Sequence, residues 1–544
     1  MKQTKLKTAP ACPGKDEGNI SIPIGLVESF DRYFELIGMN DLLNGFKTRG
    51  EPLAPLVRCM CVHTLDGVNS MQSCSDWASD ERVRRMMGIE GKGSQRTFNR
   101  ALGILGEKRV EVIERLFKGI GENFDIDDDA IAADGSAVAR ESDHGDLAGS
   151  GLPRDRNPDG MQTEFMIAVY QMSKIPFYIA PFSGEVSDEE QYARSLPEIL
   201  SLLDHGRMDA YADYIEEWRP PRERSRNEQI HPFKDGVDLS ELRKRVSPVH
   251  WVVLDNGGAS KYNTDLICGL GHGYITRKKL NETDKSRIID EKWEYVEPGV
   301  WCYRNTFDSS KRTTYLYFNE ALYAMKRRNA VKRFEKRLEA TRKVMEGRIP
   351  KSDMVQVKDI PFVDFDVTVT IQNVLTDFTE EDREREITRM MGRAPGIFKL
   401  ESSSELTPKE ALDLYRNRVV VEHTISSVKQ VSGIKPMRVW RRQSVVGSLV
   451  LALLVEAVLS MARYDLDPER VVRRRHGMEC IVETRPSTKR INESLRHLTV
   501  TYVGGKQRGR KPIYSNWEPI STRIFEALDL HSRFGKHWRD RIEA

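Results

Sequence analysis

Three widely separated carboxylates have the surroundings that metal-assisted chemistry needs. Asp134 interrupts the small apolar segment AIAADGSAVA, Asp255 directly follows the apolar run WVVL, and Glu422 lies in YRNRVVVEHTISSVK. Carboxylate oxygens are the ligands that Mg²⁺ and Mn²⁺ prefer. If the three converge, they could hold two ions that activate a water or a 3′ hydroxyl and stabilise the leaving oxygen of a phosphoryl transfer.

Glu422 shares one face of a predicted helix with three other polar residues. At 100° per residue, the four fall within roughly 60° of arc, beside an apolar stripe typical of a core-facing helix. The polar set is Tyr415, Arg418, Glu422 and Lys429, and the apolar set is Leu414, Val421, Ile425 and Val428. The segment TPKE at 407–410 has the pattern of a helix start, so one helix is predicted over about 408–430. Taken alone, this helix also allows an ordinary surface ion pair between Arg418 and Glu422.

Both aspartates are predicted to lie at the ends of strands. Residues 251–254 predict a buried strand that ends at Asp255, and Gly257 and Gly258 permit a tight turn before a short helix. Ligands of open α/β sheets bind at the ends of strands. The acidic run at 125–129 supplies rivals to Asp134, namely Asp127, Asp128 and Asp129, but Asp134 is preferred because it ends an apolar strand.

These residues carry a family resemblance. The chain resembles insertion-sequence transposases of the DDE type, in the branch marked by the signature Tyr-x2-Arg-x3-Glu-x6-Lys. Tyr415, Arg418, Glu422 and Lys429 match that signature at every spacing, and AADGSAVA and VVLDNGGAS resemble the segments of the two aspartates. The likeness covers residues 22–463.

The resemblance implies an α/β fold, with an RNase H-like catalytic core split by an inserted, mainly β domain and preceded by an α-helical DNA-binding domain. Asp134, Asp255 and Glu422 would bind Mg²⁺, for which Mn²⁺ could substitute, and Tyr415, Arg418 and Lys429 would contact phosphates of the element end. The implied reaction is cleavage at terminal inverted repeats and strand transfer into target DNA, by a dimer on DNA. A nuclease of the same fold without strand transfer, and a catalytically silent DNA-binding derivative, are the alternatives.

Composition along the chain divides it into six segments. We predict a disordered tail at 1–21, a helical domain at 22–124, core at 125–272, an inserted β-rich domain at 273–400, core again at 401–463, and a basic C-terminal region at 464–544. Residues 431–544 hold 22 Lys and Arg against 12 Asp and Glu, which favours a polyanionic partner. Seven scattered cysteines indicate a reducing cytoplasm, and the resemblance implies a prokaryotic one, near the nucleoid.

Two further segments and a pair of tryptophans each allow two interpretations. Residues 444–462 are apolar enough to suggest a membrane span, but Glu456 within it and flanking arginines favour a buried core helix and no membrane. Residues 93–105 fit a DNA recognition helix and a plain surface helix equally well. Trp301 and Trp440 lie beside arginines and could stack on an extruded base, but core packing is favoured for each.

Overall fold

The computed structural model describes most of residues 18–530 as two compact units. The first comprises residues up to Tyr274 and from Arg416 onward, and the second comprises Ile275–Tyr415. The residues between 18 and 530 that it does not describe are 48, 67–69, 127–129, 141–143, 152–159, 221–230, 241–249, 283, 285–291, 308–311, 346–378, 432–433, 435–436, 476–477, 505–512 and 516. The rival aspartates at 127–129 therefore lie outside the described residues.

A mixed sheet forms the centre of the first unit. Its strands are β2 (Ile131–Ala139), β3 (Gln162–Tyr170), β4 (Pro176–Ser183), β5 (Trp251–Leu254) and the start of β6 (Gly273–Lys278), in the order β4-β3-β2-β5-β6. The pairs β2–β3 and β3–β4 are antiparallel, whereas β2 and β5 are parallel. Since β3 is buried along its whole length, the sheet is covered on both faces. The fold is therefore mixed α/β.

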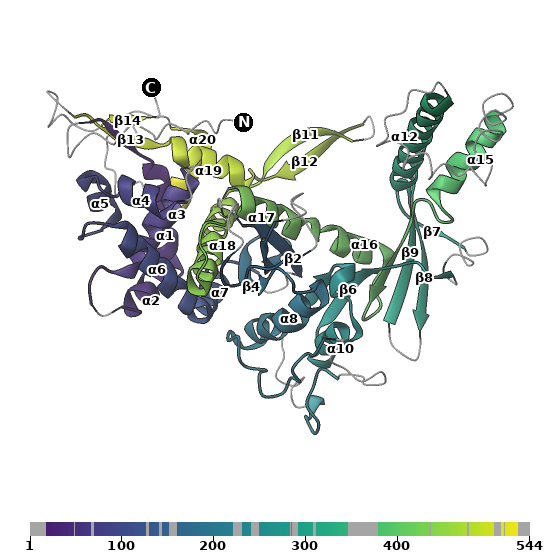
Figure 1. Ribbon diagram of the computed structural model, residues 1–544, viewed down its shortest axis with the longest axis horizontal. Helices are drawn as coiled ribbons and strands as arrows, with labels where there is room; N and C mark the ends of the chain where they lie inside the picture. The colour runs from purple at the N-terminus through teal and green to yellow at the C-terminus, as the bar shows by residue number, and fades with distance from the viewer. Residues whose placement is uncertain are drawn as a thin grey trace. The chain divides into compact units, whose positions relative to one another are not determined.

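Helices cover this sheet, and one of them is almost entirely buried. Helix α18 (Arg442–Tyr464) contacts β4 on one side and the N-terminal helices on the other (Figure 1). It is the one described helix long and apolar enough to cross a membrane, and 94% of its most apolar stretch is buried inside the protein. The predicted buried helix is confirmed. Other helices of the first unit are α1 (Ile24–Leu36), α2 (Met39–Gly45), α3 (Leu53–Leu65), α4 (Met71–Trp77), α5 (Glu81–Met87), α6 (Gln95–Glu107), α7 (Arg109–Asn123), α8 (Asp188–His205), α10 (Lys261–Gly269) and α17 (Val419–Gln430).

The two ends of the described chain fold together. Strand β1 (Ile20–Ile22) pairs with β13 (Thr499–Tyr502), which pairs in turn with β14 (Ile513–Ser515). Helix α1 packs against α19 (Thr488–His497) and α20 (Pro519–Ala527). A hairpin of β11 (Glu469–Arg475) and β12 (Met478–Thr484) precedes them. The C-terminal residues thus complete the core of the N-terminal helices.

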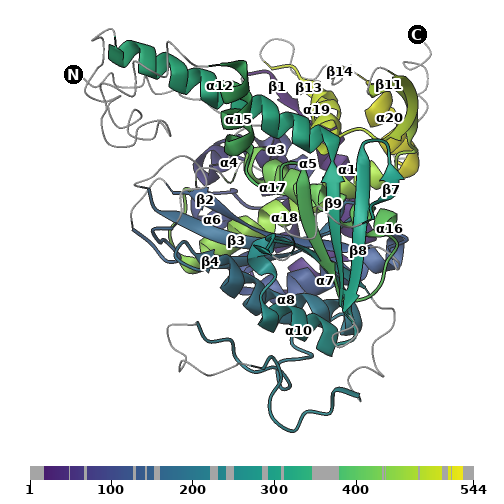
Figure 2. The ribbon, with the colours of Figure 1, turned by 90° about the vertical axis from the view of Figure 1, so that its right-hand side faces the viewer.

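The second unit contains an antiparallel sheet and two helices. Its strands run in the order β6-β10-β9-β8-β7, with β7 (Glu294–Glu297), β8 (Val300–Phe307), β9 (Arg312–Asn319) and β10 (Ile397–Ser402). Figure 2 shows β8 and β9 side by side, with the long helix α12 (Glu320–Met345) following β9. Helix α15 (Glu380–Met391) packs on α12, and α16 (Pro408–Arg416) follows β10. Residues 346–378 of the β-rich domain predicted at 273–400 lie outside the described residues.

The single helix predicted over 408–430 is instead two helices, α16 and α17. The predicted start is correct, since the side chains of Thr407 and Glu410 cap each other's backbone N–H groups. At the break, the N–H groups of Val420 and Val421 donate to carbonyls three residues back, at Asn417 and Arg418. Arg418 itself keeps helical backbone angles. The chain therefore tightens for one turn, without a glycine or proline to signal it.

Candidate active site

Asp134 and Asp255 occupy equivalent positions on neighbouring parallel strands. Ile131 of β2 pairs with Val252 of β5, and Ala132 pairs with Val253. Asp134 lies two residues beyond the second pair on β2, and Asp255 lies two residues beyond it on the chain leaving β5. Asp255 retains extended backbone angles, φ −78° and ψ 167°. Because side chains alternate along extended chain, both carboxylates are placed on the same face of the sheet.

One of the two predicted strand ends is correct. Asp255 directly follows β5, as predicted. Asp134, however, is the fourth residue of the nine-residue strand β2, so the prediction that it ends a strand is wrong. The small residues after Asp134 continue in extended conformation because they pair with β3 as far as Ala139.

Arg418 links Glu422 to Asp134. Helix α17 packs against β2 and β3 and carries Glu422 in its first turn. The Nη1 atom of Arg418 lies 3.0 Å from Oδ2 of Asp134, and its Nη2 atom donates to Oε1 of Glu422. The Arg418 and Asp134 side chains are 13% and 20% exposed, whereas that of Glu422 is 51% exposed. A largely buried cation therefore lies between two of the three predicted carboxylates.

The charge of Asp255 acts on Asp134. Burial raises the pKa of Asp134 from 3.8 to about 6, Arg418 opposes the rise, and the nearby charge of Asp255 adds to it. A carboxyl with a raised pKa that is still ionised at neutral pH is stabilised by any added cation. The pair is therefore placed and charged to attract a positive ion.

Tyr192 of α8 contacts both chain segments that carry the aspartates, a role that the sequence does not predict. Its hydroxyl donates to the carbonyl of Ala133 at 2.6 Å, next to Asp134. A Cβ atom built at Gly258, in the 3₁₀ turn Asn256–Gly258 after Asp255, would lie 2.6 Å from the Tyr192 ring. Burial raises the pKa of this phenol well above its ordinary value, and the charges of Asp134 and Asp255 add to the rise. Only a glycine at 258 lets the turn approach the ring, so Tyr192 positions both carboxylate-bearing segments.

The other two residues of the signature fall in different units. Lys429 is half-buried and lies on α17, the same helix as Glu422. Tyr415 is half-buried and is the last residue of the second unit. Their contacts with DNA stay predictions, as does that of Arg418.

The three carboxylates supply oxygen ligands of the kind that a divalent cation prefers, but they do not form a metal-binding group. Among the described residues, no group of three or more His, Cys, Asp and Glu side chains is arranged to hold a metal ion. The two aspartates share a face of the sheet, and Arg418 supplies positive charge between Asp134 and Glu422. Carboxylate oxygens are the ligand type that Mg²⁺ prefers, and Arg418 pairs with two of them in its place.

The tryptophans differ from each other in their surroundings. The Trp301 ring lies against those of Phe318 and Tyr295. Trp440, in contrast, is 61% exposed, so the prediction of core packing is wrong for it.

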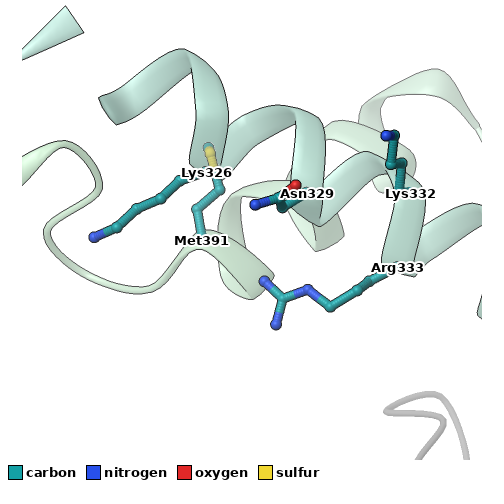
Figure 3. Close-up of a pocket in the computed structure, with 5 residues that line it drawn as sticks. All are labelled: Lys326, Asn329, Lys332, Arg333 and Met391. Carbon is teal, nitrogen blue, oxygen red and sulfur yellow. The ribbon is translucent and has the colours of Figure 1, made fainter. Parts of the chain in front are cut away.

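The second unit has a cationic pocket of its own. Lys326, Asn329, Lys332 and Arg333 of α12 line a cavity of about 580 Å³ together with Met391 (Figure 3). Arg333 donates to the carbonyl of Met390 at 3.2 Å, which ties the basic helix to α15. The pocket thus lies within the segment predicted as the inserted domain at 273–400.

The comparisons with known proteins include a distant structural neighbour. No protein-family model matches the chain, and no curated protein matches it. Among solved structures, the chain is similar to a cryo-EM structure of the piggyBac transposase synaptic complex with hairpin DNA, at 9% identity and a TM-score of 0.35. The match covers 97% of this chain and 87% of that one. A TM-score of this size does not show a shared fold.

Proposed function

We propose that the protein is a metal-dependent DNA transposase with an RNase H-like core. The observation that carries the proposal is the register of β2 and β5, which places Asp134 and Asp255 at equivalent positions of neighbouring parallel strands. Arg418 then ties Glu422, distant in sequence, to the first of them. If Asp134, Asp255 and Glu422 converge on one site, their charges repel one another unless cations intervene.

Asp134, Asp255 and Glu422 would hold Mg²⁺ or Mn²⁺. When bound, such ions activate a water or 3′ hydroxyl and stabilise the leaving oxygen of phosphoryl transfer. Tyr192 and Gly258 keep the aspartate-bearing segments in place. Arg418 neutralises Asp134 and Glu422 where no ion is bound, and its guanidinium is suited to a DNA phosphate once the carboxylates have another counter-charge.

The substrate would be the ends of an insertion sequence, with target DNA as the acceptor. Tyr415, Arg418 and Lys429 would contact phosphates of the element end, which positions the strand without reading its sequence. A dimer that holds two ends together is expected. This assignment of branch and substrate rests on the signature spacing of the four residues.

The test uses DNA that flanks the coding region, where we expect terminal inverted repeats. With purified protein and Mg²⁺, an oligonucleotide in which flanking DNA follows the repeat should be cleaved at the repeat end. One that already ends in the repeat with a free 3′ hydroxyl should be joined to a target plasmid. Cleavage without joining would indicate a nuclease of the same fold instead.

A catalytically silent DNA-binding protein is the second candidate, because Arg418 already pairs with two of the three carboxylates. Titration with Mn²⁺, followed by electron paramagnetic resonance, separates the two. Saturable binding that is lost in Asp134→Asn supports the enzyme, and no saturable binding supports the silent protein.

A further inference from the structure

A cationic groove in the first unit is separate from the three carboxylates. It has a volume of about 1070 Å³ and is lined by α4, α6, the start of α18 and the segment that precedes α18. Four arginines line it, Arg96 and Arg100 from α6 and Arg438 and Arg441 from the other wall, against a single carboxylate, Glu107. The groove therefore carries net positive charge.

The positive charge of the groove is available to a ligand. In the part of the chain that the structure describes, Arg96, Arg100 and Arg441 form no salt bridge. All three are exposed on the surface. Arginines without carboxylate partners at a concave surface attract polyanions, and they bind phosphates through a planar, multidentate donor group.

Trp440 lies in the same groove on a backbone that is held in place. The Met437 N–H donates to the Ala139 carbonyl, and Nη2 of Arg140 donates to the Val439 carbonyl, each at 3.0 Å. The Trp440 carbonyl accepts from the Asp146 N–H at 2.9 Å. The ring is nevertheless 61% exposed. A large ring that is exposed on a fixed backbone is already positioned for a flat partner, so ordering it on binding costs little.

We propose that this groove binds an unpaired stretch of DNA, with phosphates on Arg96, Arg100 and Arg441 and a base stacked on Trp440. A nucleotide has both a phosphate that arginines can bind and a flat base that can stack on Trp440. Sites that bind single strands likewise combine a basic groove with aromatic rings on which bases stack. An acidic peptide would use the arginines but not the ring. A base within a duplex is already stacked and would leave Trp440 exposed.

The groove is connected to the strand that carries Asp134. Met437 bonds to Ala139, which lies five residues beyond Asp134 on β2. At about 3.3 Å per residue, that spacing is roughly 17 Å. DNA bound at Trp440 would thus contact a segment that is bonded to the strand carrying Asp134. The inference rests on the proposed DNA substrate, but binding can be measured without cleavage.

The experiment measures fluorescence anisotropy of a labelled single-stranded oligonucleotide and of its duplex, with the full chain in EDTA. We expect Trp440→Ala to weaken single-strand binding about tenfold and to leave duplex binding within about twofold. Trp440→Phe should restore most of the affinity because it keeps a ring. Arg96→Ala/Arg100→Ala should weaken binding and reduce the salt dependence by about 1.4 in slope.

A charge-matched control is Arg85→Ala/Arg207→Ala, whose side chains are 78% and 65% exposed and lie outside the groove. It should leave single-strand binding within about twofold. Unchanged single-strand binding in Trp440→Ala, or an equal loss for single strand and duplex, would overturn the inference. Asp255→Ala should bind as the wild type does in EDTA, so failure of the catalytic assignment leaves this result intact.

Discussion

At the scale of single residues, Arg418 decides how the carboxylates coexist without metal. Its guanidinium pairs with Asp134, which is 20% exposed, and with Glu422. We expect Arg418→Ala to destabilise the metal-free protein by about 1–3 kcal/mol, because Asp134 loses its counter-charge in a largely buried site. In thermal unfolding, added Mn²⁺ should then raise the Tm more than it does for the wild type.

Arg194→Ala is the matched control, because Arg194 is 55% exposed and pairs with Glu190 on the surface of α8. It should leave the metal-induced shift as in the wild type. Equal shifts in Arg418→Ala and the wild type would show that Arg418 does not compete with the cation.

Gly258 is the second residue on which the site depends. A Cβ there would lie 2.6 Å from the Tyr192 ring, so we expect Gly258→Ala to lower the free energy of unfolding by about 1–3 kcal/mol. The change should also weaken Mn²⁺ binding, since the turn that begins at Asp255 must shift. Gly121→Ala is the control: apart from its chain neighbours and the nearby backbone of α7, nothing lies within 4 Å of that Cβ, so a gain of about 0.5–1 kcal/mol is expected. Urea unfolding in which both variants behave alike would contradict this packing.

Asp255, Asp134 and Tyr192 show which parts of the site the sequence can and cannot predict. Asp255 could be placed at a strand end because a run of apolar residues stops directly before it. Asp134 could not, since the small residues after it extend β2 through pairing with β3, a contact that local patterns do not encode. Tyr192 was missed because its role depends on Gly258, which lies in another segment.

At the scale of elements, α17 and α18 meet through a buried carboxyl group. The Ser427 hydroxyl on α17 donates to Glu456 on α18 at 2.6 Å, and Glu456 is 2% exposed. Burial raises the pKa of Glu456 from 4.5 to about 7. The unfolded chain therefore loses this proton at lower pH than the folded protein does. The penalty on stability is absent below pH 4.5, grows as the pH rises to about 7, and is constant above it.

Glu456→Gln removes this penalty and keeps an oxygen that accepts from Ser427. We expect it to stabilise the protein by up to roughly 3 kcal/mol at pH 8 and to have little effect at pH 4.5. The measurement is chemical unfolding at several pH values, with Glu35→Gln, a change at a 52% exposed surface position, as the control. A stabilisation that does not depend on pH would contradict the assignment.

Helices are easier to predict from this sequence than the breaks between them. The start of α16 follows from its capping residues, and burial of α18 follows from its apolar run. The break between α16 and α17 carries no helix-breaking residue, and it falls at the boundary between the two units. The backbone around Trp440 is likewise held by the Arg140 side chain, which donates to Val439, and by the Asp146 N–H, which donates to Trp440; no local pattern encodes these bonds.

At the scale of the whole molecule, residues near the C-terminus stabilise the N-terminal helices. Leu495 of α19 is fully buried, and its backbone approaches α1 at Gly25. We expect Leu495→Ala to cost about 2–5 kcal/mol. It should also reduce amide-hydrogen protection in α1 and β1, although these lie at the other end of the chain.

Ile513→Ala serves as the control, since Ile513 is 53% exposed on β14 and its loss should change stability by less than about 0.5 kcal/mol. Unaltered protection of β1 in Leu495→Ala would indicate that the two ends fold independently. Pairing of β1 with β13 could not be predicted from sequence, because neither strand's local pattern specifies a partner so distant along the chain.

For the molecule as a whole, we propose that Asp134, Asp255 and Glu422 act together on DNA. The most direct measurement compares wild type and Asp255→Ala, in Mg²⁺, for cleavage and joining of DNA that carries the flanking repeats. We predict that Asp255→Ala retains DNA binding and loses both cleavage and joining. If the purified variant still cleaves and joins these ends, Asp255 is not part of the catalytic centre and the account is wrong.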